Sequence, residues 1–298
     1  MMGTKARLGI GAAAASLAVL AVAGCSGSGG SSSTGATGVG SGTGGNSAAL
    51  SLVADAMNKA NSAGTVKVTG TMTMPGSTTP MTMTAEEEYS PSLEMSMTTQ
   101  INGQSISEIL VNDKLYMKYS ALSAEMGGKQ WGEIDLSSAS GAMGSLSSLL
   151  SSVRNQNPTT QMSALVASGD VTKVGSATVD GQQATHYSGT LTAGQLATLT
   201  GSSGKLTAAQ VAQLKSLIQE ANVSAVTIDV WISSGGLPIE EKYSEKMSTG
   251  TVAGDMHMSD WGAPVSVGAP PASEVYNMTS ALTGAQASAS AAAASSSS

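Results

Sequence analysis

Apolar and polar residues alternate with a period of two in several runs of the chain, and this pattern is the strongest constraint on its fold. One run places Val66, Val68, Met72 and Met74 at alternate positions, between Lys67, Thr69, Thr71 and Thr73. A second run places Val226, Ile228, Val230 and Ile232 at alternate positions, between Thr227, Asp229 and Trp231. Successive side chains of a strand point to opposite faces, so both runs predict strands that are buried on one side.

Turn-forming residues separate these runs. Asn112-Asp113 and Asp180-Gly181 favour tight turns, because these residue types tolerate the left-handed backbone region. The sequence therefore predicts successive hairpins of an antiparallel sheet. The expected strands lie at or near Val66–Met74, Met81–Met83, Leu93–Met97, Ile109–Tyr119, Trp131–Leu136, Val171, Ala184–Leu191, Val226–Ile232, the stretch from Gly236 to Met247, and Thr251–Trp261.

Helical spacing appears between the groups of strands. Leu50–Ala60 has apolar residues at helical intervals behind Ser47, a plausible N-cap. A capping box of Thr207 and Gln210 opens a helix expected to end near Ala221. Two shorter helices are expected over Leu146–Val153 and Met162–Val166. Strands grouped in runs with helices between them indicate an α+β fold, with a bent antiparallel sheet wrapped over helices.

The first 25 residues have the organisation of a secretion signal. Lys5 and Arg7 precede the uncharged apolar run Leu8–Ala23, which is followed by Gly24-Cys25. Val22-Ala23-Gly24-Cys25 resembles the bacterial lipobox, in which the cysteine receives a diacylglyceryl group and becomes the new N-terminus. Since stable anchoring requires about two acyl chains, such a cysteine would be a firm membrane anchor. We therefore expect a lipoprotein held to the outer face of the cytoplasmic membrane by lipid on Cys25.

Composition divides the chain into four parts. Residues 1–24 are the expected signal peptide, 25–47 the lipidated cysteine and a flexible tether rich in Gly and Ser, 48–282 the domain, and 283–298 a disordered Ala/Ser tail. Removing residues 1–24 takes away two basic residues and no acidic ones, which changes the formal charge from −7 to −9. An acidic domain without a basic patch argues against nucleic acid as a partner and against electrostatic docking on anionic lipid.

Several short phrases, taken together, resemble one family. They are Val179-Asp180-Gly181-Gln182, Thr185-His186-Tyr187, Val230-Trp231-Ile232, Gly236-Leu237-Pro238, Ser259-Asp260-Trp261-Gly262 and Ala269-Pro270-Pro271. In this order behind a lipobox they resemble the actinobacterial LppX/LprF/LprG lipoproteins, over roughly Ala48 to Tyr276. The resemblance implies a LolA-like half-barrel with an apolar cavity, and a carrier or chaperone of envelope lipids or glycolipids. Related folds also serve as sensors or regulators that bind a membrane protein, which is the alternative function.

Methionine is unusually frequent, with 17 residues, whereas phenylalanine is absent. In a strand, each Met-x-Met pair places two thioethers on one face, about 6.6 Å apart. These side chains either fill a core, as adaptable thioethers do, or line a lipid cavity. The residues expected to form the cavity wall are Val68, Met72, Met74, Met81, Met83, Met95, Met97, Val226, Ile228 and Val230.

A copper(I) site at Met256-His257-Met258 is a third interpretation, because thioethers are soft ligands. Strand alternation turns His257 away from the two sulfurs, which argues against that site. The chain contains no G-x-S-x-G, H-E-x-x-H or P-loop motif, and two histidines are few for a zinc site. The acidic run Glu86–Glu88 is expected to be a solvated strand end or edge. The sequence therefore predicts a binding protein without catalytic residues, metal or cofactor.

Overall fold

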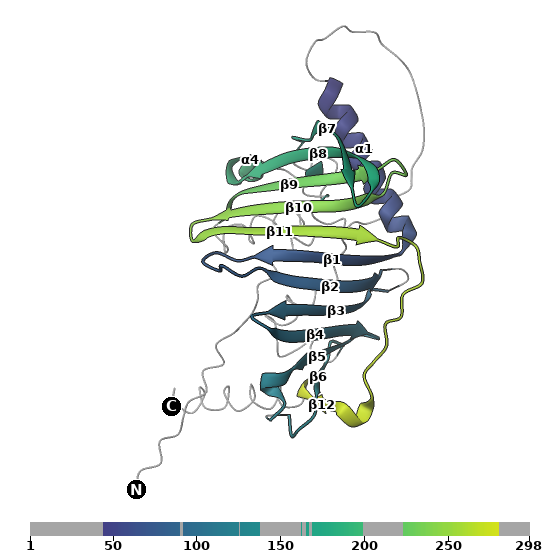
Figure 1. The fold of residues 1–298 in the computed structure, drawn as a ribbon, viewed down its shortest axis with the longest axis vertical. Coiled ribbons are helices and arrows are strands. Elements are labelled where there is room, and N and C mark those ends of the chain that lie inside the picture. The colour runs from purple at the N-terminus through teal and green to yellow at the C-terminus, as the bar shows by residue number, and fades with distance from the viewer. Residues whose placement is uncertain are drawn as a thin grey trace, which may run out of the picture.

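The computed structural model describes residues 44–89, 92–124, 126–137, 162, 165–166, 169–198 and 223–279. They contain one sheet of twelve strands, in the order β12-β6-β5-β4-β3-β2-β1-β11-β10-β9-β8-β7 (Figure 1). The strands are β1 Thr65–Thr73, β2 Met81–Glu88, β3 Glu94–Ile101, β4 Gln104–Val111, β5 Lys114–Tyr119, β6 Trp131–Asp135, β7 Thr172–Val179, β8 Gln182–Thr192, β9 Val223–Ser233, β10 Pro238–Met247, β11 Gly250–Ser259 and β12 Val275–Asn277.

Two meanders make up this sheet. Strands β1 to β6 follow one another as antiparallel neighbours, and so do β7 to β11. The meanders meet where β1 pairs with β11, for example at Val68 opposite Met258. The short strand β12 lies parallel to β6 at one end of the sheet. The expected antiparallel sheet is confirmed, with this one parallel pair at its edge.

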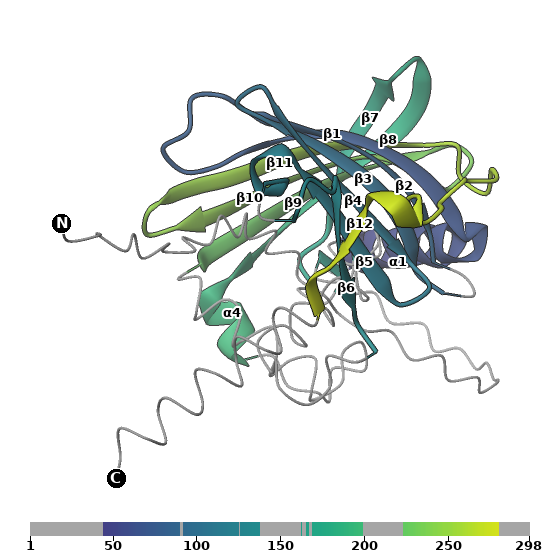
Figure 2. The ribbon, with the colours of Figure 1, turned by 90° about the horizontal axis from the view of Figure 1, so that it is seen from below.

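Helices α1 (Gly44–Ala63) and α4 (Ala193–Thr198) lie on the same side of the bent sheet (Figure 2). Helix α1 buries Ala49, Val53, Ala56 and Ala60, which recur at intervals of three and four residues as one face of a helix requires. It contacts β7 and β10. We call the face of the sheet that α1 covers the inner face, and the opposite face the outer face.

The described residues are mostly β with few helices, so the expected α+β fold is confirmed in its antiparallel sheet and only in part in its helices. Helix α1 begins at Gly44, inside the segment expected to be a tether. The sequence did not predict the short elements α4 and β12. The helices expected at Leu146–Val153 and Thr207–Ala221 lie outside the described residues. Among the described residues, no helix combines the length and apolar character needed to cross a membrane.

Tight turns lie where the sequence places them. Asn112 and Asp113 join β4 to β5 with φ of 51° and 58°, and Asp180 and Gly181 join β7 to β8 with φ of 48° and 78°. Two consecutive positive φ values match the right-handed twist of the flanking strands. These turns fix the strand registers, and thereby decide which side chains reach the inner face.

Candidate functional site

Apolar side chains gather on the inner face in two clusters. The first, which we call the α1 cluster, joins Val53 of α1 to inner-face residues of β8, β9 and β10, including Val226, Ile228 and Val230. The second, the β1–β6 cluster, joins side chains of β1, β3, β4, β5 and β6, including Val68, Met95 and Met97. The inner face is therefore apolar along both meanders.

The ten residues expected to line a cavity all belong to these clusters. Val68, Met72, Met95, Met97, Val226, Ile228 and Val230 are buried, whereas Met74, Met81 and Met83 are half-buried at the margins. The structure divides them, because Met72, Met74, Met81 and the three β9 residues pack in the α1 cluster, and Val68, Met83, Met95 and Met97 in the β1–β6 cluster. They form a shared face, and an enclosed cavity between them stays a prediction.

Met256 connects the two clusters. It is half-buried on β11 and packs against both of them. Its sulfur occupies the space beside Gly70 on β1, where a β-carbon would lie 2.4 Å from Met256 Sδ and 2.6 Å from the Asp255 carbonyl oxygen. Tyr243 lies over Gly254 in the same way, with a ring carbon 2.1 Å from the position of a β-carbon. Glycines in the middle of these strands therefore make room for large inner-face side chains.

Four glutamates also point to the inner face. Register places Glu87 on β2 opposite Met95, and Glu241 on β10 between Met256 and Val230. Glu245 lies four residues beyond Glu241 on the same face, and Glu108 on β4 lies opposite Met97 and Met117. No described basic side chain forms a salt bridge with any of the four. An apolar face with several unpaired carboxyl groups is uncommon in a protein core.

Burial raises the pKa of each of these carboxyl groups. The pKa of Glu241 rises to about 8, and those of Glu245 and Glu87 to about 7. Burial likewise raises the pKa of Glu108. Glu241 is only 4% exposed, and its Oε2 has no hydrogen-bond partner. At neutral pH Glu241 is therefore mostly protonated and can donate a hydrogen bond, and Glu87 and Glu245 keep a proton part of the time.

The sequence does not predict that these glutamates are buried. Residues 239–246 read Ile-Glu-Glu-Lys-Tyr-Ser-Glu-Lys, which shows no alternation of apolar and polar residues. Alternation alone places Glu241 and Glu245 on the face of Tyr243, but only the pairing with β9 and β11 shows that this face is the inner one. The expectation that Glu86–Glu88 forms a solvated end or edge is wrong for Glu87, because β2 lies between β1 and β3 and turns this residue inward.

Both histidines lie on the outer face. His186 Nε2 lies 2.8 Å from Asp229 Oδ1, and its ring stacks on Trp231 with centroids 4.1 Å apart. His257 points away from the inner-face residues Met256 and Met258, as strand alternation predicts. The three residues of the proposed copper(I) site therefore do not converge on one point.

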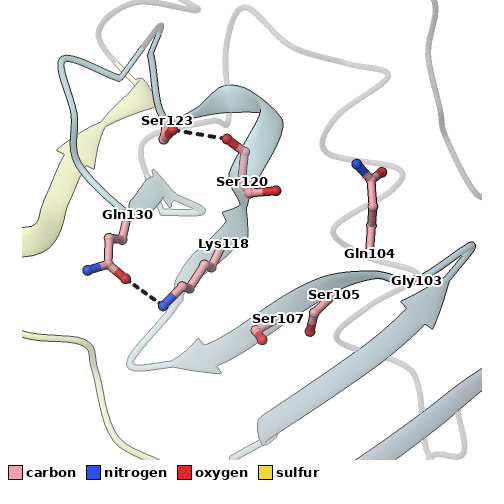
Figure 3. Close-up of a pocket in the computed structure, with 8 residues that line it drawn as sticks. All are labelled: Gly103, Gln104, Ser105, Ser107, Lys118, Ser120, Ser123 and Gln130. Atoms are coloured by element: carbon pink, nitrogen blue, oxygen red, sulfur yellow. Dashed lines mark hydrogen bonds between the residues drawn. The ribbon is translucent and has the colours of Figure 1, made fainter.

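A polar pocket of about 440 Å³ lies on the outer face where β4 begins and β5 ends (Figure 3). It is lined by Gly103, Gln104, Ser105, Ser107, Lys118, Ser120, Ser123 and Gln130. Lys118 Nζ donates to Gln130 Oε1 at 2.5 Å, and Ser123 Oγ donates to the Ser120 carbonyl at 2.9 Å. The lining of this pocket is polar and differs from the apolar one expected of a lipid cavity.

No family model matches this chain. An uncharacterized 31.2 kDa protein of the rplA-rplJ intergenic region of Streptomyces griseus is 35% identical to it over 160 residues. That alignment covers 53% of this chain and 51% of the Streptomyces protein, so the chain spans about half the length of this curated relative.

Among solved structures, the Mycobacterium tuberculosis lipoprotein LppX aligns with 74% of this chain and 99% of its own, at 17% identity and a TM-score of 0.44. LprF from Mycobacterium bovis aligns with 75% of this chain and 97% of its own, also at 17% identity and a TM-score of 0.44. The chain is similar in structure to LppX and LprF. These two lipoproteins belong to the family whose sequence phrases this chain resembles.

Proposed function

We propose that the protein is a lipid-anchored, non-catalytic binding protein that holds an acyl chain of a lipid or glycolipid against its inner face, as a carrier or chaperone in the cell envelope. Lipid on Cys25 would hold it at the outer face of the cytoplasmic membrane. The observation that carries the proposal is the apolar inner face, on which two clusters meet at Met256. The lipobox-like sequence before Cys25 supports the anchored location.

Methionine suits this role for a physical reason. Thioether side chains are unbranched and polarizable, so they adapt to apolar surfaces of varied shape. Met74, Met81 and Met83 are half-buried at the margins of the clusters, where side chains can rearrange around a ligand. These methionines are the residues that we expect to contact an acyl chain first.

The inner-face glutamates would serve the polar part of such a ligand. A protonated carboxyl group donates one hydrogen bond and adds no charge to an apolar surface. Ester, amide and hydroxyl oxygens of lipid linkages accept such a bond. Glu241, whose Oε2 lacks a partner, is the residue that we assign to this contact.

The test is lipid extraction and mass spectrometry on the full chain purified from a related bacterium. Two neighbouring β2 variants provide the comparison. Met83→Gln replaces an inner-face thioether by a polar side chain of similar size, and Thr84→Gln introduces the same glutamine side chain on the outer face. We expect a defined non-covalent lipid with the wild type and Thr84→Gln, and at least threefold less with Met83→Gln. Protein that is isolated empty and takes up no acyl probe would contradict the proposal.

The alternative is a sensor or regulatory lipoprotein that binds a protein partner. The same preparations distinguish the two functions. A single membrane protein that co-purifies in a stoichiometric amount, with no bound lipid, would favour partner binding. The Met83→Gln and Thr84→Gln pair then identifies the face involved. Loss of the partner in Thr84→Gln alone would place the contact on the outer face.

A further inference from the structure

The outer face gathers a histidine and three carboxylates from three separate segments. His257 and Asp255 are on β11, Glu240 is opposite His257 on β10, and Asp180 is in the turn between β7 and β8. The β7–β8 hairpin rises on the side of the sheet away from α1 (Figure 2). It contributes Val179 and Ala184 to a small apolar cluster with Ile239. This packing brings Asp180 within 2.8 Å of a histidine 77 residues away in sequence.

His257 is held between two carboxylates. Its Nδ1 lies 2.8 Å from Asp180 Oδ2, and its Nε2 lies 3.5 Å from Asp255 Oδ1. An ionised Asp180 can only accept a hydrogen bond, so Nδ1 carries the proton in the neutral imidazole. The lone pair of Nε2 then points toward Asp255 Oδ1. This oxygen is buried and has no hydrogen-bond partner.

Two acceptor atoms that face each other repel unless a proton or a metal ion lies between them. In a tetrahedral zinc site, bonds of about 2.0–2.2 Å to nitrogen and oxygen place two ligand atoms roughly 3.3 Å apart. The 3.5 Å between His257 Nε2 and Asp255 Oδ1 is close to this separation. Glu240 supplies a third ligand, since one ligand atom from each of the three residues lies within 4.8 Å of the others.

Asp180 has the geometry of a supporting residue. In protein zinc sites, the ring nitrogen of a ligating histidine that does not bind the metal usually donates to a carboxylate, which fixes the tautomer. The 2.8 Å contact of Asp180 with His257 Nδ1 is this arrangement. We therefore propose that His257, Asp255 and Glu240 form a zinc site on the outer face, with Asp180 orienting the imidazole.

Lys242 is the group that zinc would displace. Its Nζ lies 2.8 Å from Glu240 Oε1 and 3.2 Å from Asp255 Oδ2, so its ammonium neutralises the carboxylates of the site. The same ammonium lies 5.2 Å from the Trp231 ring centroid, and Asp229 is opposite Lys242 on β9. These two residues offer the ammonium another position when a metal ion takes Glu240 and Asp255.

From the sequence alone, two histidines are few for a zinc site. Strand alternation places His257 on the face away from Met256 and Met258, which excludes a shared site with the sulfurs. Only the fold brings oxygen ligands from β10 and the β7–β8 turn to that histidine. Imidazole and carboxylate together suit zinc better than copper(I), which prefers thiolates and thioethers.

The test is calorimetric titration of the full, untagged chain in detergent micelles with ZnCl₂. We expect one zinc ion per chain at micromolar affinity or tighter, at least tenfold weaker binding in His257→Gln and Asp255→Asn, and about 10–100-fold weaker binding in Asp180→Asn. His186→Gln is the matched control, because His186 is also bonded to an aspartate on the same face. It should bind zinc as the wild type does.

Lys242→Met provides a second test, in which the expected change in zinc affinity is an increase. Removing the competing ammonium should tighten zinc binding several-fold, whereas adventitious surface binding would not respond. The proposal is overturned if the wild type binds no zinc below millimolar concentration, if His257→Gln binds zinc as the wild type does, or if His186→Gln lowers the affinity equally. All of these readouts are independent of lipid binding, so the zinc site and the proposed function can fail separately.

Discussion

Met256 on β11 fills the space beside Gly70 on β1, at the junction of the two meanders. A β-carbon at residue 70 would approach both Met256 Sδ and the carbonyl oxygen of Asp255, and the second of these is backbone that cannot rotate away. Gly70→Ala should therefore lower the free energy of unfolding by about 1–3 kcal/mol through overpacking. Urea denaturation followed by circular dichroism measures this.

Gly175→Ala is the control for that change. Gly175 is also a strand glycine, on β7, but its β-carbon would meet nothing within 4 Å. The stability of this variant should stay within about 0.5 kcal/mol of the wild type. Equal losses in the two variants would contradict overpacking as the cause, because a β-carbon at residue 175 meets nothing and Gly→Ala by itself lowers the entropy of the unfolded chain, which favours the folded state.

Met256→Ala should uncouple the two inner-face clusters. Truncating this side chain removes apolar contacts from both clusters, with an expected loss of about 1–3 kcal/mol. Met74→Ala removes contacts from the α1 cluster alone and should cost less. Denaturation curves that stay equally steep for both variants, with equal midpoints, would contradict a connecting role for Met256.

The buried glutamates predict that the protein is more stable in mild acid than at pH 8. In the unfolded chain these carboxyl groups ionise near pH 4.5, whereas Glu241 in the folded protein keeps its proton up to a pKa of about 8. The folded state then binds more protons than the unfolded state between these values, so stability falls as pH rises from about 5 to 8. Thermal melting across this range should show a Tm that decreases.

Glu241→Gln should weaken this pH dependence, because the amide does not ionise. Its Tm should exceed that of the wild type by several degrees at pH 8, and the advantage should shrink toward pH 5. Glu94→Gln, at the start of β3 and on the outer face, is the control and should melt in parallel with the wild type. A Glu241→Gln profile parallel to the wild type would mean that burial of this carboxyl group is not the cause.

Cys25 predicts a defined N-terminus. Mass spectrometry of protein from membranes should find a mature chain that begins at Cys25 and carries a diacylglyceryl group. Cys25→Ala should keep residues 1–24 and lack the lipid, whereas Ser26→Ala should be processed as the wild type is. An unmodified cysteine in the wild type would contradict the anchor.

The sequence predicted the strands well because alternation is a local property. The run from Val66 to Met74 and the run from Val226 to Ile232 each identify their own buried face without knowledge of the neighbouring strand. The turns at Asn112-Asp113 and Asp180-Gly181 are local in the same sense, since their residue types suit positive φ.

Strand pairing cannot be predicted from local alternation and turn residues. Alternation places Glu87 on the face of Met83 and Glu241 on the face of Tyr243, but only the pairing with neighbouring strands shows that these faces are covered. The same holds for His257 and Asp180, which only the packing of the β7–β8 hairpin brings together. Features formed within one segment were predicted, and features formed by two distant segments were not.

The pairing of β1 with β11 also bears on how the chain folds as it is made. Strand β1 ends at Thr73 and its partner begins at Gly250, so β1 to β6 are synthesised long before β11 exists. Until then the backbone amides and carbonyls along one side of β1 have no strand to bind, and an open strand edge invites pairing with other chains. Contacts of such large sequence separation also slow folding. We therefore expect the nascent protein to pass through an aggregation-prone, half-built sheet, and an export chaperone that shields β1 would improve its yield.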